Sequence, residues 1–165
     1  MKIIFRILWL AALAGLGVWL WLVLFPSPEK AVRKCLAEVA RTASFSPGQG
    51  DLARLAAARS LAGHFGTNVE MNLDLAGHVQ NSPMTREEIT QAVLLAGSGS
   101  GSLKVKFPDV NVTVAPDRQS AVANVTIEAT LSGEHDPVVQ EMKFTLQKID
   151  GQWLITRVET VHTLS

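Results

Sequence analysis

The sequence has few of the side chains from which catalytic and metal-binding sites are usually built. It contains no tyrosine, and Cys35 is the single cysteine among 165 residues. One cysteine cannot form an intramolecular disulfide, so it does not report the redox compartment. Charged residues make up 18% of the chain and the formal net charge is zero, whereas soluble domains usually contain about 25% charged residues. Because the whole protein has no field of one sign, we expect no nucleic-acid binding.

Recognisable catalytic motifs are also missing. The four histidines, His64, His78, His135 and His162, show none of the short spacings of metal sites, so we expect no metal and no cofactor. No serine lies in a nucleophile-elbow context. Cys35 falls on the apolar side of a predicted helix, where we expect a buried, unreactive thiol. The sequence therefore predicts no catalytic residue and does not favour an enzyme.

The N-terminal region contains a long apolar run. No charged or strongly polar residue occurs from Ile7 to Phe25, and about 20 helical residues span a bilayer core. The run is longer than the apolar part of a cleaved signal peptide, and no small-x-small cleavage site follows it. We therefore predict a short cytoplasmic tail at 1–6, a transmembrane signal anchor at 7–25 that contacts the lipid bilayer, and a domain at 26–165.

The side of the membrane on which the domain lies is less clearly encoded. Basic residues flank the predicted span almost equally, with Lys2 and Arg6 before it and Lys30, Arg33 and Lys34 after it. A single N-terminal anchor with a very short leading tail usually keeps that tail in the cytoplasm. We predict a single-pass protein of a bacterial inner membrane, with its C-terminal domain outside the cytoplasm.

The rest of the chain predicts three helices and about five strands. The first helix is predicted to start at Ser27, Pro28 and Glu29. A second is predicted to be capped by Asp51, and its apolar residues include Leu52, Leu55, Ala56 and Leu61. A third is predicted from the capping box of Thr85 and Glu88. "NVEMNLDL" alternates as a half-buried strand, and "GHVQNSP" after it is predicted to be a loop. From Ser102 onward, four strands joined by short turns, including Asp150–Gly151, predict an antiparallel meander.

This order resembles the nuclear-transport-factor-2-like superfamily, which shares a cone-shaped α+β fold with ketosteroid isomerases and polyketide cyclases. The resemblance rests on the strand "NVEMNLDLAG", the passage "NSPMTREEI" and the ending "KIDGQWLITRVETV". It implies three helices packed on a strongly curved, mainly antiparallel sheet, with a pocket between them. It also implies that the strand containing Trp153 forms one wall of the cone.

Strand alternation suggests which residues surround such a pocket. The apolar candidates are Met71, Leu73, Val125, Ile127, Phe144 and Trp153. Asp74 and His78 could meet around the turn after the first strand as a polar group of the pocket. For Trp153 itself, plain core packing is the favoured interpretation and lining a ligand cavity the alternative. Thr126, Glu128, Lys143 and Thr145 are expected on the opposite sheet face, through which the chain could form a homodimer or bind another membrane protein.

Two hypotheses about function remain open from the sequence. Isomerases of this superfamily use a tyrosine as an oxyanion donor, and this chain has none. The anchor followed by a cone also resembles the bitopic scaffold subunits of bacterial envelope complexes. The sequence thus favours a membrane-anchored, non-catalytic interaction or small-ligand-binding domain, an accessory of such a complex. The alternative is a divergent cone-fold enzyme of isomerase or cyclase type, or a carrier of a lipophilic small molecule.

Overall fold

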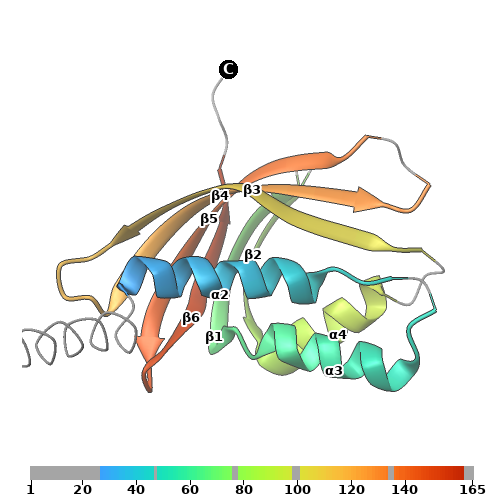
Figure 1. The fold of residues 1–165 in the computed structure, drawn as a ribbon, viewed down its shortest axis with the longest axis horizontal. Helices are drawn as coiled ribbons and strands as arrows, with labels where there is room; N and C mark the ends of the chain where they lie inside the picture. The colour runs from blue at the N-terminus through green and yellow to red at the C-terminus, as the bar shows by residue number, and fades with distance from the viewer. Residues whose placement is uncertain (1–26, 47, 76–77, 98–100, 134–135, 162–165) are drawn as a thin grey trace, which may run out of the picture.

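The computed structural model describes residues 27–46, 48–75, 78–97, 101–133 and 136–161. A single curved sheet arches over three helices, which all lie on its concave side (Figure 1). The helices are α2 (Pro28–Ala43), α3 (Asp51–Ala62) and α4 (Arg86–Ala96). This two-layer arrangement lets one face of the sheet and one face of each helix leave water together.

The prediction that Asp51 caps the second helix was wrong: Gly50 is the N-cap residue of α3, no side chain caps it, and Asp51 lies in the first turn. At α2 and α4, local signals work as the sequence predicts. The Ser27 hydroxyl accepts a hydrogen bond from the Lys30 backbone N–H at 3.4 Å, and Pro28 occupies the first turn. At α4, the Thr85 hydroxyl accepts from the Glu88 N–H at 3.3 Å, while the Glu88 carboxylate accepts from the Thr85 N–H at 2.7 Å. Both bonds of the capping box are therefore present, and they fix where α4 begins.

The sheet has six strands rather than about five. They are β1 (Phe65–Leu75), β2 (His78–Thr85), β3 (Leu103–Val114), β4 (Ser120–Leu131), β5 (Val138–Ile149) and β6 (Gln152–Thr160). Their order is β2-β1-β6-β5-β4-β3, with β1 and β6 parallel and every other pair antiparallel. The last four strands form the predicted meander, and Asp150 and Gly151 make its final turn with positive φ angles of 51° and 80°.

The prediction of a loop after the first strand was wrong. β2 occupies this region and pairs antiparallel with β1 from Asn68↔Thr85 to Leu75↔His78. Its sequence is polar and contains Pro83, which argues against a central strand but is tolerated at an edge. Because β2 has only one neighbouring strand, it needs neither two apolar faces nor a complete set of backbone donors.

Irregular pairing curves the sheet. The register between β3 and β4 shifts between Lys106 and Asp109, on either side of Pro108. β3 is also an edge strand, and proline is tolerated both at bulges and on edge strands because it lacks a backbone N–H. A second shift lies between Thr145 and Leu146 on β5. Such bulges bend a strand and increase its twist, which makes the sheet concave toward the helices.

The core lies between the concave face of the sheet and the helices. Its most deeply buried large side chains are Leu36, Leu146, Ile155, Val32 and Val69. On α2, the predicted apolar face is buried. On α3, the prediction is confirmed for Leu61, which is 6% exposed, but was wrong for Leu52, which is 84% exposed; Ala58 and Ala62 are buried beside Leu61. The alanine-rich sequence of α3 has no strong apolar stripe, so its packing against α4 decides which face is buried.

The described residues include no helix that combines the length and apolar character needed to cross a membrane. The predicted cytoplasmic tail at 1–6 and the predicted anchor at 7–25 both lie outside the described residues.

Candidate functional site

The apolar residues predicted to surround a pocket all belong to one hydrophobic cluster, but they differ in burial. Val125, Phe144 and Trp153 are 3%, 4% and 8% exposed. Met71, Leu73 and Ile127 are only half-buried and pack against the rim of the same cluster. The first three side chains are therefore part of the core, whereas the second three retain a surface that a ligand could reach.

Strand register places these half-buried residues near one end of the sheet. Met71 pairs with Val158, which pairs with Phe144, so these residues form a row across β1, β6 and β5. One step further along, Val125 pairs with Met142, and Met142 pairs with Thr160. Ile127 lies beyond that row, opposite Gln140. We call Met71, Leu73, Ile127 and Met142 the rim cluster.

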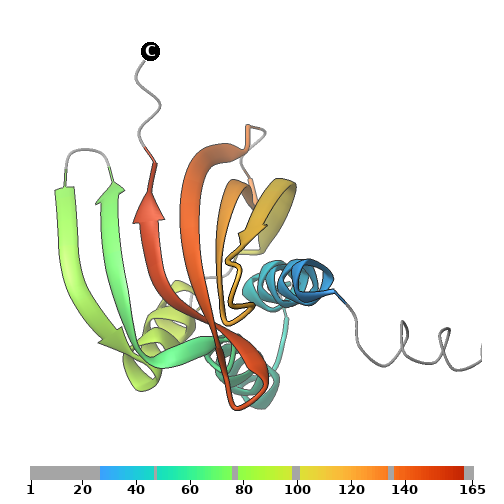
Figure 2. The same ribbon diagram turned by 90° about the vertical axis from the view of Figure 1, so that its left-hand side faces the viewer.

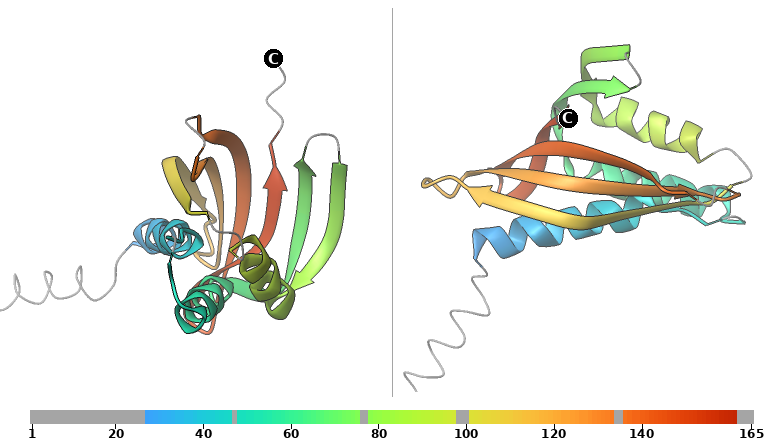
Figure 3. Two further views of the ribbon diagram at one scale, coloured as in Figure 1. Left: turned by 90° about the vertical axis from the view of Figure 1, so that its right-hand side faces the viewer. Right: turned by 90° about the horizontal axis from the view of Figure 1, so that it is seen from above.

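The helices leave this end of the sheet less covered. α2 contacts β3 and β6, and α4 contacts β1 and β2. The C-terminal ends of β1 and β6 and the N-terminal end of β5 extend past all three helices (Figure 2). The opposite view and the view from above show the same arrangement, with α2 beside β3 and α4 beside β1 and β2 (Figure 3). The rim cluster thus belongs to the part of the concave face where the strands lack helical cover.

The described side chains that pair with the rim cluster are uncharged. Within the described part of the chain, no polar or charged residue is buried. Met71, Ile127 and Met142 pair with Ser82, Gln140 and Thr160 respectively, and Leu73 pairs with Gln80. These four partners are neutral residues that can donate or accept hydrogen bonds. His78, opposite Leu75, follows on the same face at the end of the β1–β2 hairpin. A molecule that lies against the rim cluster would therefore meet mainly apolar and neutral polar groups.

Charged side chains gather on the convex face instead. Lys143 Nζ lies 3.0 Å from a carboxylate oxygen of Glu159. Arg157 contacts Glu70 on the neighbouring strand and lies 3.9 Å from Glu159. Lys143, together with the Asn72 amide and Arg157, lowers the pKa of Glu159. Lys143, which the sequence assigns to the docking face, therefore belongs to a cross-strand ion-pair network. Thr145, assigned to the same face, pairs with Arg157 of that network.

The proposed polar pair of Asp74 and His78 is not aligned by the strand register. Asp74 pairs with Val79, while His78 pairs with Leu75, at the end of the β1–β2 hairpin. The Asp74 backbone N–H donates to the Thr160 hydroxyl at 3.2 Å, which ties β1 to β6. The side chain of His78 lies outside the described part of the structure, so contact between the two side chains stays a prediction.

Two open hollows lie on the helical side of the molecule. One of about 480 Å³ lies between α3 and α4 and is lined by Leu55, Arg59, Ala62, Gly63, Arg86, Glu87, Thr90 and Gln91. Another of about 340 Å³ lies between α2 and the β3 bulge, lined by Arg33, Ala37, Phe107, Pro108, Asp109 and Val110. Neither hollow involves the residues that the sequence predicts around a pocket.

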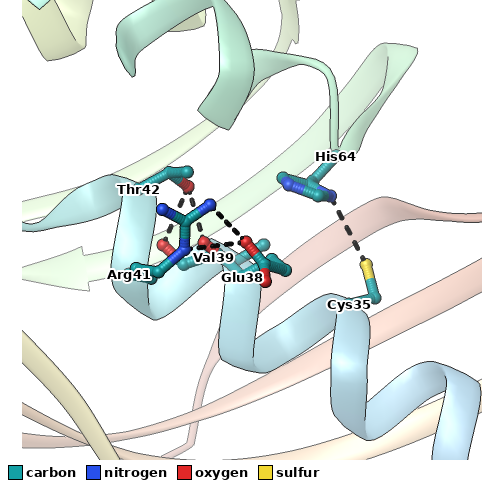
Figure 4. A network of polar contacts seen from close by, with 6 residues as sticks. All are labelled: Cys35, Glu38, Val39, Arg41, Thr42 and His64. Carbon is teal, nitrogen blue, oxygen red and sulfur yellow. Dashed lines mark hydrogen bonds and ion pairs between the residues drawn. The ribbon is translucent and has the colours of Figure 1, made fainter.

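A side-chain pair that the sequence does not reveal lies at the start of β1. Cys35 on α2 has its Sγ 3.9 Å from Nδ1 of His64 (Figure 4). The thiol also donates a hydrogen bond to the Trp153 carbonyl at 3.3 Å. The thiol is half-buried rather than buried as predicted. Burial raises its pKa to about 11 and also lowers the pKa of His64, an effect that Glu38 opposes. Both groups are therefore neutral near pH 7.

We expect Cys35 to react slowly with iodoacetamide in the folded protein. With a pKa of about 11, only about 0.1% of the thiol is ionised at pH 8, against about a quarter of an ordinary cysteine. Alkylation at pH 8 should be about a hundredfold slower than in the same chain unfolded in urea, and should accelerate about tenfold per pH unit up to pH 10. Equal rates in the folded and unfolded chains at pH 8 would contradict this assignment.

Comparisons with known proteins identify the fold. No family model matches the chain, and neither does any curated protein. Among solved structures, an NTF2-like protein of unknown function from Pseudomonas putida KT2440 superposes with a TM-score of 0.62 at 9% identity, covering 86% of this chain and 90% of that one. A protein from Novosphingobium aromaticivorans DSM 12444, provisionally named a scytalone dehydratase, gives 0.59 at 14% identity, with coverages of 82% and 84%.

A third solved structure has a fold described as cystatin-like. A domain of unknown function with a cystatin-like fold from Nostoc punctiforme PCC 73102 gives a TM-score of 0.57 at 17% identity, covering 86% of this chain and 80% of that one. At such low identities, the likeness establishes the fold alone. The chain therefore has the α+β cone fold of nuclear-transport-factor-2-like proteins, as the sequence resemblance predicts, and function has to be argued from the site.

Proposed function

We propose that this chain is a membrane-anchored, non-catalytic domain whose cone binds an uncharged, apolar small molecule at the rim cluster. The observation that supports this proposal is the half-buried apolar surface of Met71, Leu73, Ile127 and Met142, whose pairing partners are uncharged. Ligand sites are typically concave and mostly apolar, with a few polar groups that orient the ligand. Ser82, Gln140 and Thr160 are suitably placed for that role.

The absence of charge among the partners of the rim cluster defines the class of ligand. Burial of a carboxylate or phosphate without a paired cation is strongly unfavourable, and none of the residues that pair with the rim cluster is a lysine or arginine. A neutral molecule with an apolar body and one or two polar groups is the best match. The predicted anchor would hold the cone at the membrane surface, where such molecules partition, and would suit an accessory role in an envelope complex.

Two substitutions on adjacent residues test the proposal. Ile127→Lys places an ammonium group on the concave face, whereas Thr126→Lys places one on the opposite face of the same strand. We expect the fragment 27–165 to bind the neutral fluorescent probe N-phenyl-1-naphthylamine. Ile127→Lys should weaken binding about tenfold or more, because the probe would bury the introduced charge, while Thr126→Lys should change it less than about twofold.

Fluorescence titration measures these affinities, and circular dichroism confirms that each variant is folded. Absence of probe binding by the wild-type fragment, or equal losses in the two variants, would contradict a ligand site at the rim cluster. Conversion of a ketosteroid-like or lactone substrate, with activity lost in Asp74→Asn, would instead favour the alternative of a divergent cone-fold enzyme.

A further inference from the structure

We propose that Cys35 and His64 form a two-ligand site for a monovalent soft metal ion, with Cu(I) as the favoured ion. The two residues are 29 positions apart in the chain and lie on different elements, α2 and the segment between α3 and β1. The fold brings them together, which explains why sequence spacing alone indicates no metal site. This inference does not depend on ligand binding at the rim cluster.

The distance between the two candidate ligand atoms suits one bridging ion. Cys35 Sγ and His64 Nδ1 are 3.9 Å apart. Zinc, a d¹⁰ ion like Cu(I), bonds to thiolate sulfur at about 2.3 Å and to imidazole nitrogen at about 2.0 Å. With those bond lengths and the observed separation, the angle at the ion is about 130°. An ion could therefore bind both atoms without moving α2 relative to β1.

Electrostatics favour a singly charged ion over a doubly charged one. A thiolate and a neutral imidazole together carry one negative charge, so a monovalent ion makes the site neutral. A dication would leave a net positive charge at a half-buried position, where an unpaired charge is unfavourable. The Glu38 carboxylate does not supply the missing charge, because it binds Arg41 through two hydrogen bonds of 2.9 and 2.6 Å (Figure 4).

The number of available ligands leads to the same choice. Within the part of the chain that the structure describes, no group of three or more histidine, cysteine or acidic side chains could hold a metal. Structural zinc sites need four ligands, whereas soft thiolate ligands select Cu(I). In the binding step, the Cys35 thiol releases its proton to solvent, its hydrogen bond to the Trp153 carbonyl is lost, and sulfur and Nδ1 each donate an electron pair to the ion.

Anaerobic titration of the full chain in detergent with Cu(I), in competition with a chromophoric Cu(I) chelator, tests this site. We expect one tightly bound Cu(I) per chain. Cys35→Ser should lower the affinity at least about a hundredfold and His64→Ala at least about tenfold, while His162→Ala should leave it unchanged. Zn²⁺ should bind far more weakly than Cu(I).

Specific results would overturn the proposal. If Cys35→Ser or His64→Ala binds Cu(I) as tightly as the wild type, with folding verified by circular dichroism, the two residues do not form the site. If the wild type binds Zn²⁺ as tightly as Cu(I), the argument from charge and ligand number is wrong. Two separate ligand variants ensure that a folding defect in one of them does not prevent a decision.

Discussion

Phe144→Ala should lower the free energy of unfolding by about 3–5 kcal/mol, a large part of the 5–15 kcal/mol typical of a domain. Phe144 is 4% exposed. Its ring lies 6.2 Å from that of Phe107, centroid to centroid, with the two planes tilted by 37°. Removal of the ring would lose this contact and leave a cavity between β5 and the helices, which the surrounding structure can only partly fill.

Urea denaturation of the wild type and the variant measures this difference. Leu52→Ala is the matched control, because Leu52 is 84% exposed and its truncation should change stability by less than about 0.5 kcal/mol. A loss of less than about 1.5 kcal/mol for Phe144→Ala would mean that little packs against the ring. That result would reassign Phe144 from the core to the wall of an open cavity, which is the role that the sequence suggests for it.

Leu13→Arg combined with Leu16→Arg should abolish membrane integration. Both residues lie near the middle of the predicted anchor at 7–25. An arginine at the centre of a transmembrane helix costs about 2.5–3.5 kcal/mol on the insertion scale, so two cost about 5–7 kcal/mol. In a bacterial host, the wild-type chain should remain in the membrane pellet after an alkaline carbonate wash. The double variant should be recovered in the soluble fraction.

The control for this experiment is Leu13→Ile with Leu16→Ile, which preserves apolar character and should stay in the pellet. Recovery of the wild-type chain in the carbonate supernatant would contradict the anchor. The same cells test orientation, because a protease added to intact spheroplasts should remove a C-terminal tag if the domain lies outside the cytoplasm. A tag protected until the cells are lysed would place the domain on the cytoplasmic side.

Several features of the fold could be predicted because they depend on short stretches of sequence. The capping box at Thr85 and Glu88 needs only residues three positions apart. The turn at Asp150 and Gly151 needs two residues that accept positive φ angles. The alternation through Val69, Met71 and Leu73 assigns one face of β1 to the core, since successive strand side chains point in opposite directions.

Other features required contacts between distant parts of the chain. β2 is a strand because β1 pairs with it, although its own sequence is polar and contains Pro83. The face of α3 that is buried was decided by α4, because an alanine-rich helix has no strong preference of its own. The prediction for β2 failed, and that for α3 failed at Leu52 but not at Leu61, because local sequence carries little information there and a neighbouring element supplies the deciding contacts.

The candidate sites show the same division. Alternation in the sequence selects Val125, Ile127 and Phe144 for the concave face, but only the packed structure separates the buried core of Val125 and Phe144 from the half-exposed Ile127. The approach of Cys35 to His64 likewise exists only once α2 lies across β6 and the start of β1. The sequence by itself determined the caps of α2 and α4, the strands of the meander with their turns, and the inward-facing residues of β1 and β4, because these depend on neighbours along the chain. Burial and the meeting of distant side chains were decided by the tertiary structure, because they depend on which surfaces exclude water together.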